Sequence, residues 1–207
     1  MRKKLISIIS IIVILIGLIP ISSKAVVPID TAYIYANKKT EGLLMWKGLK
    51  IHTHLAVYKK DGKEYPAYCM NRELPGVEIG RSQTVDVKQL VNNVMVWRTI
   101  INGYPYKSIS ELGCNTEEEA YLATKQAVYW IIKHGNEPNA KIENIYTHFR
   151  AGETEINNQN LEDIQRRGKK VVDAIYKLVN IAANEQREEI IHPEVIQEDN
   201  FIIDKDN

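Results

Sequence analysis

Cys69 and Gln126 are the two side chains of this sequence whose chemistry combines to make a reactive bond. Cys69 ends a strand-like segment within residues 68–71 (Tyr-Cys-Met-Asn), and Gln126 lies in a helix-like segment, residues 124–130. A thiolate is a strong nucleophile, and a carboxamide held against it can lose ammonia and leave an acyl group on sulfur. The pair therefore predicts an internal thioester, through which a protein can attach covalently to an amine.

Other roles for Cys69 stay open on the sequence alone. The chain has two cysteines, and in an exported protein Cys69 and Cys114 could form a disulfide. Cys69 could instead be a small buried apolar residue, which is a common fate of free cysteine. A cysteine hydrolase would pair Cys69 with His134 or His148, but the cysteine has no helix N-terminus to lower its pKa.

A metal site is a weaker candidate. His52 and His54 alternate along one strand-like segment and so share a face. No nearby Cys, Asp or Glu at ligand spacing completes a site with them. We expect two exposed strand histidines and no metal.

The elements that must position Cys69 are strands. The pattern over residues 32–69 is strand-like, and Asp61-Gly62 predicts a hairpin turn within it. The second arm of this hairpin ends at Cys69. A loop over residues 71–80 follows, in which Pro75-Gly76 predicts a turn.

Gln126 should lie on a helix. Thr116 followed by Glu119 predicts the start of a helix over residues 116–134. Two further helices are predicted, one over residues 87–101, with Asp86 and Gln89 as its capping pair, and one from residue 161 to about 187.

The helix of residues 116–134 is apolar around most of its circumference, which predicts that it is buried. Gln126 falls between Leu122 and Trp130 on this helix, so its carboxamide should leave water. A buried amide without a partner costs about 1–3 kcal/mol, which favours a special role. A hydrogen-bonded core glutamine is the alternative.

Composition indicates one folded domain. The chain has 207 residues, 44% of them hydrophobic, which is enough for a substantial core. After the first 25 residues it carries 23 basic and 26 acidic side chains, and this balance does not indicate a nucleic-acid partner.

Residues 1–25 read as a signal peptide. Three basic residues at positions 2–4 precede an apolar run that ends near a small-residue site, Ser23-Lys24-Ala25. We expect a secreted or cell-surface domain over residues 26–187, and an uncleaved membrane anchor is the alternative. Residues 188–207 read as an acidic linker or the truncated start of a following region, with no recognisable wall-sorting signal.

The segments around Cys69 and Gln126 resemble the two signature segments of the thioester domains of Gram-positive surface adhesins and pilus tips. The resemblance implies an α+β fold, in which a barrel- or sandwich-like β-rich N-terminal lobe packs on a helical lobe with the thioester between them. It also implies a single-use covalent binder at the cell wall, not an enzyme, that reacts with a lysine amine of a host extracellular protein. It implies no cofactor, no nucleic-acid partner and no membrane partner beyond the export signal, and related proteins carry further adhesin domains.

One residue departs from the family motif. The commoner motif reads Thr-Gln-x-Ala, whereas Lys125 follows Thr124 here and Gln126 comes third. Alignment on Thr124 and Ala127 would put Lys125 in the place of the glutamine and abolish the thioester, because an amine has no acyl group to donate.

We take Gln126 as the acyl donor because aromatic residues follow it at the i+3 and i+4 positions, a spacing that also fits the family. Tyr68, Tyr129 and Trp130 could shield the bond from water, and none is assigned a catalytic role. The alternative function is a noncovalent binding or capping module in which Cys69 is inert or disulfide-bonded.

Overall fold

The computed structural model describes residues 31–60, 62–73, 76–86, 89–90, 93–135, 141–154, 159–184, 195–198 and 201–204. The expected signal peptide, residues 1–25, lies outside these ranges. Among the described helices, none is both long and apolar enough to cross a membrane.

The described strands form one sheet with antiparallel pairings. Its order is β4-β1-β2-β3-β8-β7-β5, and β6 pairs with β1. The strands are β1 (Thr31–Trp46), β2 (Leu49–Lys60), β3 (Lys63–Cys69), β4 (Ser82–Asp86), β5 (Gln89–Leu90), β6 (Phe149–Ala151), β7 (Val195–Glu198) and β8 (Phe201–Asp204).

The predicted hairpin is confirmed in β2 and β3, which pair from Lys60 opposite Lys63. Gly62 in the turn has a φ of 80°, a conformation that glycine adopts without a steric cost. Asp61 lies outside the described residues. Cys69 is the last residue of β3, so this hairpin delivers the thiol to one end of the strand.

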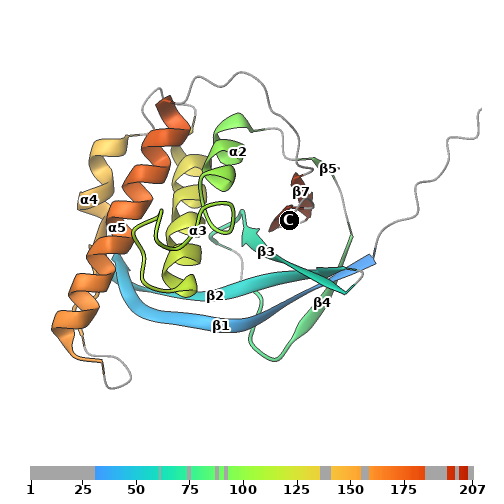
Figure 1. The fold of residues 1–207 in the computed structure, drawn as a ribbon, viewed down its shortest axis with the longest axis horizontal. Helices are drawn as coiled ribbons and strands as arrows, with labels where there is room; N and C mark the ends of the chain where they lie inside the picture. The colour runs from blue at the N-terminus through green and yellow to red at the C-terminus, as the bar shows by residue number, and fades with distance from the viewer. Residues whose placement is uncertain are drawn as a thin grey trace, which may run out of the picture.

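Helices cover one side of the long β1–β2 ribbon (Figure 1). Among them, α3 contacts β1, β2 and β3, and α5 packs against α3, α2 and α4. The predicted α+β class is confirmed. The helices are α2 (Val94–Ile101), α3 (Glu117–His134), α4 (Ile145–His148) and α5 (Leu161–Asn184), with a 3₁₀ turn at Ile142–Asn144.

The prediction of a helix from residue 87 is wrong at its start. The helix α2 begins at Val94, because the Asn93 side chain caps it and accepts hydrogen bonds from the backbone N–H groups of residues 95 and 96, both at 3.1 Å. Asp86 ends β4, and Gln89 lies in β5, so these two residues do not form a capping pair.

The other two helices start where the sequence predicts. Thr116 caps α3, and α5 runs over Leu161–Asn184, while the last residues predicted for it, 185–187, lie outside the described part. Within the expected linker, residues 188–207, the structure has β7 and β8, which the sequence analysis did not predict. The strand β8 pairs with β3 and puts Phe201 opposite Cys69.

Buried apolar residues form two clusters, and β3 contributes to both. Tyr68 belongs to the larger cluster, which contains the buried faces of α2, α3 and α5. Cys69 belongs to a smaller cluster within the sheet, against which Tyr129 packs. Successive side chains of a strand point to opposite faces, which separates these two neighbours.

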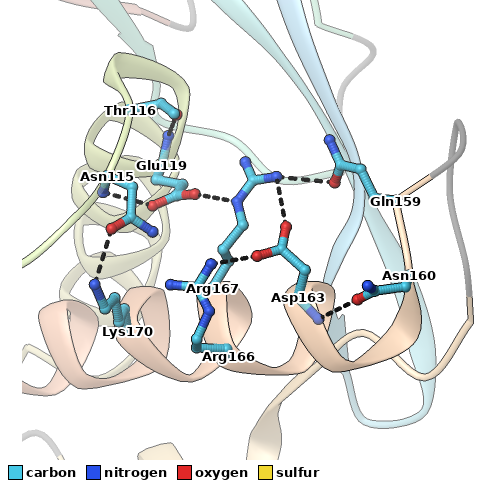
Figure 2. A network of polar contacts seen from close by, with 9 residues as sticks. All are labelled: Asn115, Thr116, Glu119, Gln159, Asn160, Asp163, Arg166, Arg167 and Lys170. Carbon is cyan, nitrogen blue, oxygen red and sulfur yellow. Dashed lines mark hydrogen bonds and ion pairs between the residues drawn. The ribbon is translucent and has the colours of Figure 1, made fainter.

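A polar network fixes the N-terminal end of α3 against α5 (Figure 2). The Glu119 side chain is fully buried, and its carboxylate accepts hydrogen bonds from the Asn115 backbone N–H at 2.7 Å and from Arg167 Nε at 2.5 Å. Thr116 Oγ1 accepts the Glu119 backbone N–H at 3.3 Å. This network sets the position of the helix that carries Gln126.

Candidate functional site

Cys69 is a buried free thiol. Its Sγ donates a hydrogen bond to the Asn71 carbonyl oxygen at 3.0 Å, and its exposed fraction is 2%. Cys114 is also free and belongs to the other apolar cluster, so the two cysteines do not form the alternative disulfide. Burial raises the pKa of the Cys114 thiol to about 12, so that thiol is unreactive at neutral pH.

A stripe of side chains on one face of α3 lies towards β2 and β3. Tyr121, Lys125 and Tyr129 recur every four residues, and Tyr129 packs against the apolar cluster that contains Cys69. Tyr121 also ties the helix to the sheet, since its hydroxyl donates to the Ala67 carbonyl oxygen at 2.5 Å and accepts the Ala56 N–H at 3.1 Å. The structure therefore brings the two predicted segments together.

Lys125 is the central residue of this stripe and is almost completely buried. Burial lowers the pKa of its amine from the usual value, and the nearby Cys69 acts in the opposite direction. Its Nζ lies 5.8 Å from the centroid of the Tyr129 ring. No carboxylate of the described residues forms an ion pair with Lys125, so its neutral form is favoured more than in an exposed lysine.

Gln126 lies next to this stripe, about 100° around the helix from Lys125. Its exposed fraction is 2%, and its Oε1 has no hydrogen-bond partner among the described residues. Gln126 lines two hollows, of about 680 and 600 Å³, and both also include Trp46, Arg72 and Tyr129. Gln126 therefore belongs to the lining that the two hollows share, at their junction.

Arg72 and Trp46 form a stack at this junction. The Arg72 guanidinium lies 4.2 Å from the centroid of the Trp46 ring, and Lys133 and Lys47 each place their Nζ 5.7 Å from the same ring. Trp46 and Arg72 line both hollows and Lys133 lines the smaller one, so positive charge lies close to an aromatic ring beside the space that Gln126 lines.

The aromatic residues predicted to shield the site lie in three different places. Tyr129 is half-buried and packs on the cluster that holds Cys69. Trp130 is buried, makes an edge contact with Trp46 at 5.9 Å and lines the smaller hollow. Tyr68 stacks on Tyr121 at 4.9 Å in the other cluster and donates to the Tyr104 carbonyl oxygen. Of the three, Tyr129 is the one that packs against the cluster containing Cys69.

Thr124 connects the signature segment to the loop before α3. Its hydroxyl donates to the Ala120 carbonyl oxygen at 2.9 Å and accepts the Tyr104 N–H at 2.9 Å. A Cβ added to Gly103 would lie 2.5 Å from Thr124 Cγ2, so this contact requires glycine.

The four histidines considered for a metal site or a cysteine hydrolase lie in two places. His52 is exposed, and His54 Nδ1 lies 2.8 Å from the Val77 carbonyl oxygen. No group of three or more His, Cys, Asp or Glu side chains in the described part of the chain could hold a metal ion. The His134 and His148 rings pack against Trp130, at 4.7 and 5.6 Å between centroids.

The geometry does not test which residue donates the acyl group, so the assignment of Gln126 stays a prediction. Lys125, the neighbour of Gln126, shares its face of α3 with Tyr129, which packs on the Cys69 cluster, and its Nζ lies 5.8 Å from the Tyr129 ring centroid. The sequence analysis considered Lys125 only as a residue that would prevent the thioester if it replaced the glutamine. Its position four residues before Tyr129 indicates that the two side chains share one face of the helix.

Comparison with known proteins gives the family. The family model described as "Thioester domain" matches residues 66–184, which include Cys69, Lys125 and Gln126. The chain belongs to the thioester-domain family. No curated protein sequence matches it closely enough to count as a relative.

Solved thioester domains share the fold. The "Thioester domain of the Enterococcus faecium TIE86 protein" superposes with a TM-score of 0.50 at 22% identity, covering 75% of this chain and 50% of that one. "The Bacillus anthracis TIE protein" gives 0.52 at 20%, covering 77% and 25%. The "N-terminal thioester domain of fibronectin-binding protein SfbI from Streptococcus pyogenes" gives 0.50 at 13%, covering 84% and 91%. The chain thus spans 50% of the Enterococcus faecium structure and 25% of the Bacillus anthracis structure.

Proposed function

We propose that this thioester domain is the covalent attachment domain of a Gram-positive surface adhesin. In this proposal an internal Cys69–Gln126 thioester reacts with a lysine amine of a host extracellular protein. The observation that supports it is the burial of Cys69 at the end of β3, a strand that contacts α3, together with the burial on α3 of Gln126, whose side-chain oxygen has no partner in the described structure. Membership of the thioester-domain family supports it.

The bond would form during folding. The Cys69 thiolate attacks Cδ of Gln126, the tetrahedral intermediate collapses, and the amide nitrogen leaves as ammonia. Sulfur and carbon are then joined, and the Gln126 oxygen becomes the thioester carbonyl. Tyr129, packed on the Cys69 cluster, keeps water from the bond.

Capture would use the hollows above Gln126. An uncharged amine entering beside Arg72 and Trp46 attacks the Gln126 acyl carbon, an amide forms, and the Cys69 thiol is released with the proton of the amine. The domain reacts once, so it is a binder and not a turnover enzyme. The proposal includes export by residues 1–25, a domain over residues 26–187, a cell-wall or secreted location, and further adhesin domains in related proteins.

Lys125 favours a second candidate function. If its amine takes the place of the acyl donor beside Cys69, the domain has no electrophile and binds its partner noncovalently through the same hollows.

The intact mass of the purified chain under nonreducing conditions tests the proposal. We expect a mass one ammonia below the calculated value in the wild type, and the full mass in Cys69→Ala and Gln126→Ala. Cys114→Ala is the matched control and should keep the deficit. Methylamine should add to the wild type and release one titratable thiol, whereas a full wild-type mass would favour the noncovalent module.

A further inference from the structure

We propose that the positively charged side chains around Trp46 select the target of the attachment site by binding an acidic residue beside the reacting lysine. The inference rests on the proposed function and adds to it the chemistry of the partner, which is a peptide segment with glutamate or aspartate next to its lysine. It concerns the surface beside Gln126 and not the thioester itself.

Three cations converge on the Trp46 ring. The Arg72 guanidinium lies 4.2 Å from the ring centroid, and the Nζ atoms of Lys47 and Lys133 each lie 5.7 Å from it. They come from the loop after β3, the turn after β1 and the last turn of α3, respectively. Trp46 is half-buried and makes an edge contact with Trp130 at 5.9 Å, so the cations gather on a ring that is held in place.

These cations lack carboxylate partners within the described structure. None of the ion pairs formed by the described residues involves Lys47, Arg72 or Lys133. By contrast, Lys38 and Lys59, which are also exposed, each pair with a glutamate. Like charges gathered near one ring repel one another, and a carboxylate from another molecule would relieve that repulsion.

The surplus of positive charge lies at the smaller hollow, which Gln126 also lines. Arg72 and Lys133 line this hollow, and Glu73 is the acid among the described residues around it. The larger hollow has a more even lining, in which Glu73 and Glu78 oppose Lys50 and Arg72. We therefore place the acidic residue of the partner at the Trp46 side of the smaller hollow, next to the path of the incoming amine.

Exposed apolar side chains border the same space. Ile132, with an exposed fraction of 39%, lines the smaller hollow, and Leu49, with 71%, lines the larger one. A small inorganic anion would make no use of these side chains, whereas a polypeptide segment can cover them while its carboxylate meets the cations. The mixed lining therefore fits a peptide.

The positive charge also suits the capture chemistry. A lysine amine attacks in its neutral form, and nearby positive charge disfavours the ammonium form. The same charge repels a protonated lysine that approaches alone. An acidic neighbour offsets this repulsion and guides the segment to the hollow, so the surface favours lysines in an acidic context.

Reaction with two matched peptides tests the inference. Both carry blocked ends and a single lysine, which is flanked by glutamate in one peptide and by glutamine in the other. The wild-type chain reacts with each at low ionic strength, and intact mass follows the covalent adduct. The ratio of the two rates measures the preference for acid and cancels any general change in the reactivity of the bond.

We expect the glutamate peptide to react about tenfold faster than the glutamine peptide, and the ratio to fall towards one at high salt. Lys133→Gln, at an exposed position of α3, should reduce the ratio about threefold, and Arg72→Gln should also reduce it. Lys169→Gln, at an exposed position of α5, is the matched control and should keep the wild-type ratio. A ratio near one in the wild type, or an unchanged ratio in both variants, would overturn the inference.

The Cys69→Ala chain separates this failure from failure of the proposed function. It forms no thioester, so the NMR signal of the Trp46 indole N–H follows binding alone. If this signal shifts with the glutamate peptide only, while the wild type captures neither peptide, the covalent function is wrong and the acid-binding surface stands. If the wild type captures both peptides equally and the signal does not shift, the inference is wrong and the covalent function stands. A shift with heparin but with neither peptide would also overturn the inference, because the surface would then bind a polysaccharide.

Discussion

The first turn and the middle of α3 bury polar groups in opposite ways. At its N-terminal end, the buried Glu119 carboxylate is paired with Arg167 and with the Asn115 backbone, and Thr116 completes the cap (Figure 2). Two turns later, Lys125 is buried without a carboxylate partner and Gln126 with an unpaired oxygen, again among the described residues. One helix thus carries buried polar groups whose hydrogen bonds are made, at its start, and buried polar groups without such partners among the described residues, in its middle.

The difference separates structural from functional burial. A buried charge with its hydrogen bonds made holds elements in register, and it is costly only when a partner is removed. A buried amine and amide without partners cost stability in the resting fold, and proteins retain such groups mainly where chemistry uses them. The contrast between the first turn and the middle of α3 can be tested by measuring stability.

Removal of Arg167 should have the largest effect. Arg167→Met leaves Glu119 buried without its cation, and we expect the free energy of unfolding to fall by about 3–5 kcal/mol in urea denaturation. Arg166→Met is the matched control, because the side chain of Arg166 is exposed and its pair with Asp163 contributes about 0–1 kcal/mol. Equal losses in the two variants would contradict the network's role.

Removal of the Lys125 amine should increase the stability of the fold. In a Cys69→Ala background, which has no bond to lose, Lys125→Met should raise the free energy of unfolding by about 1–3 kcal/mol at pH 7. The unfolded chain binds a proton that the folded chain releases, so the lysine's penalty is present below its ordinary pKa of 10.5 and declines as the pH rises towards it.

Urea denaturation at pH 7 and pH 10 checks both the gain and its decline. Lys169→Met in the same background should change stability by less than about 0.5 kcal/mol at either pH. A loss of stability in Lys125→Met would show that the amine is a satisfied core group.

Replacement of Gln126 should give a smaller gain. In the same Cys69→Ala background, Gln126→Leu removes a carboxamide whose oxygen is unpaired, and we expect about 1–2 kcal/mol of added stability from thermal and urea unfolding. Gln165→Leu, at an exposed site on α5, should be nearly neutral. Destabilisation by Gln126→Leu would mean that the amide is hydrogen-bonded in solution.

Loss of the helix cap should have the smallest effect. Thr116→Ala removes the acceptor for the Glu119 backbone N–H and should cost about 1 kcal/mol, with Thr116→Ser close to the wild type. Chemical denaturation of the three proteins measures it. A cost as large as that of Arg167→Met would mean that the cap and the ion pair act as one unit.

Sequence patterns predicted the parts of the fold that local rules decide. The Asp61-Gly62 turn, the Thr116 cap and the apolar stripe of α5 each specify an element without reference to the rest of the chain. The start of α2 was missed because two capping signals compete, and the pairing of Gln89 with β7 depends on residues more than a hundred positions away. The strands β7 and β8 were missed for the same reason.

The candidate site was predicted at the level of segments but not of side chains. The strand end at Cys69 and the helix around Gln126 meet as expected, and periodicity shows that Gln126 is buried. Which face of α3 meets Cys69 depends on how Tyr121 bonds to Ala56 and Ala67, a contact that periodicity does not reveal.

Thr124 has a consequence for how such proteins are recognised. Its hydroxyl is used by the Ala120 carbonyl and the Tyr104 N–H, and its methyl group fits against Gly103. The threonine of the signature is therefore explained by packing of the loop before α3, whatever residue follows it. In this chain the threonine therefore reports on the packing of α3, and Lys125 and Gln126, between Thr124 and Ala127, are the residues that bear on thioester formation.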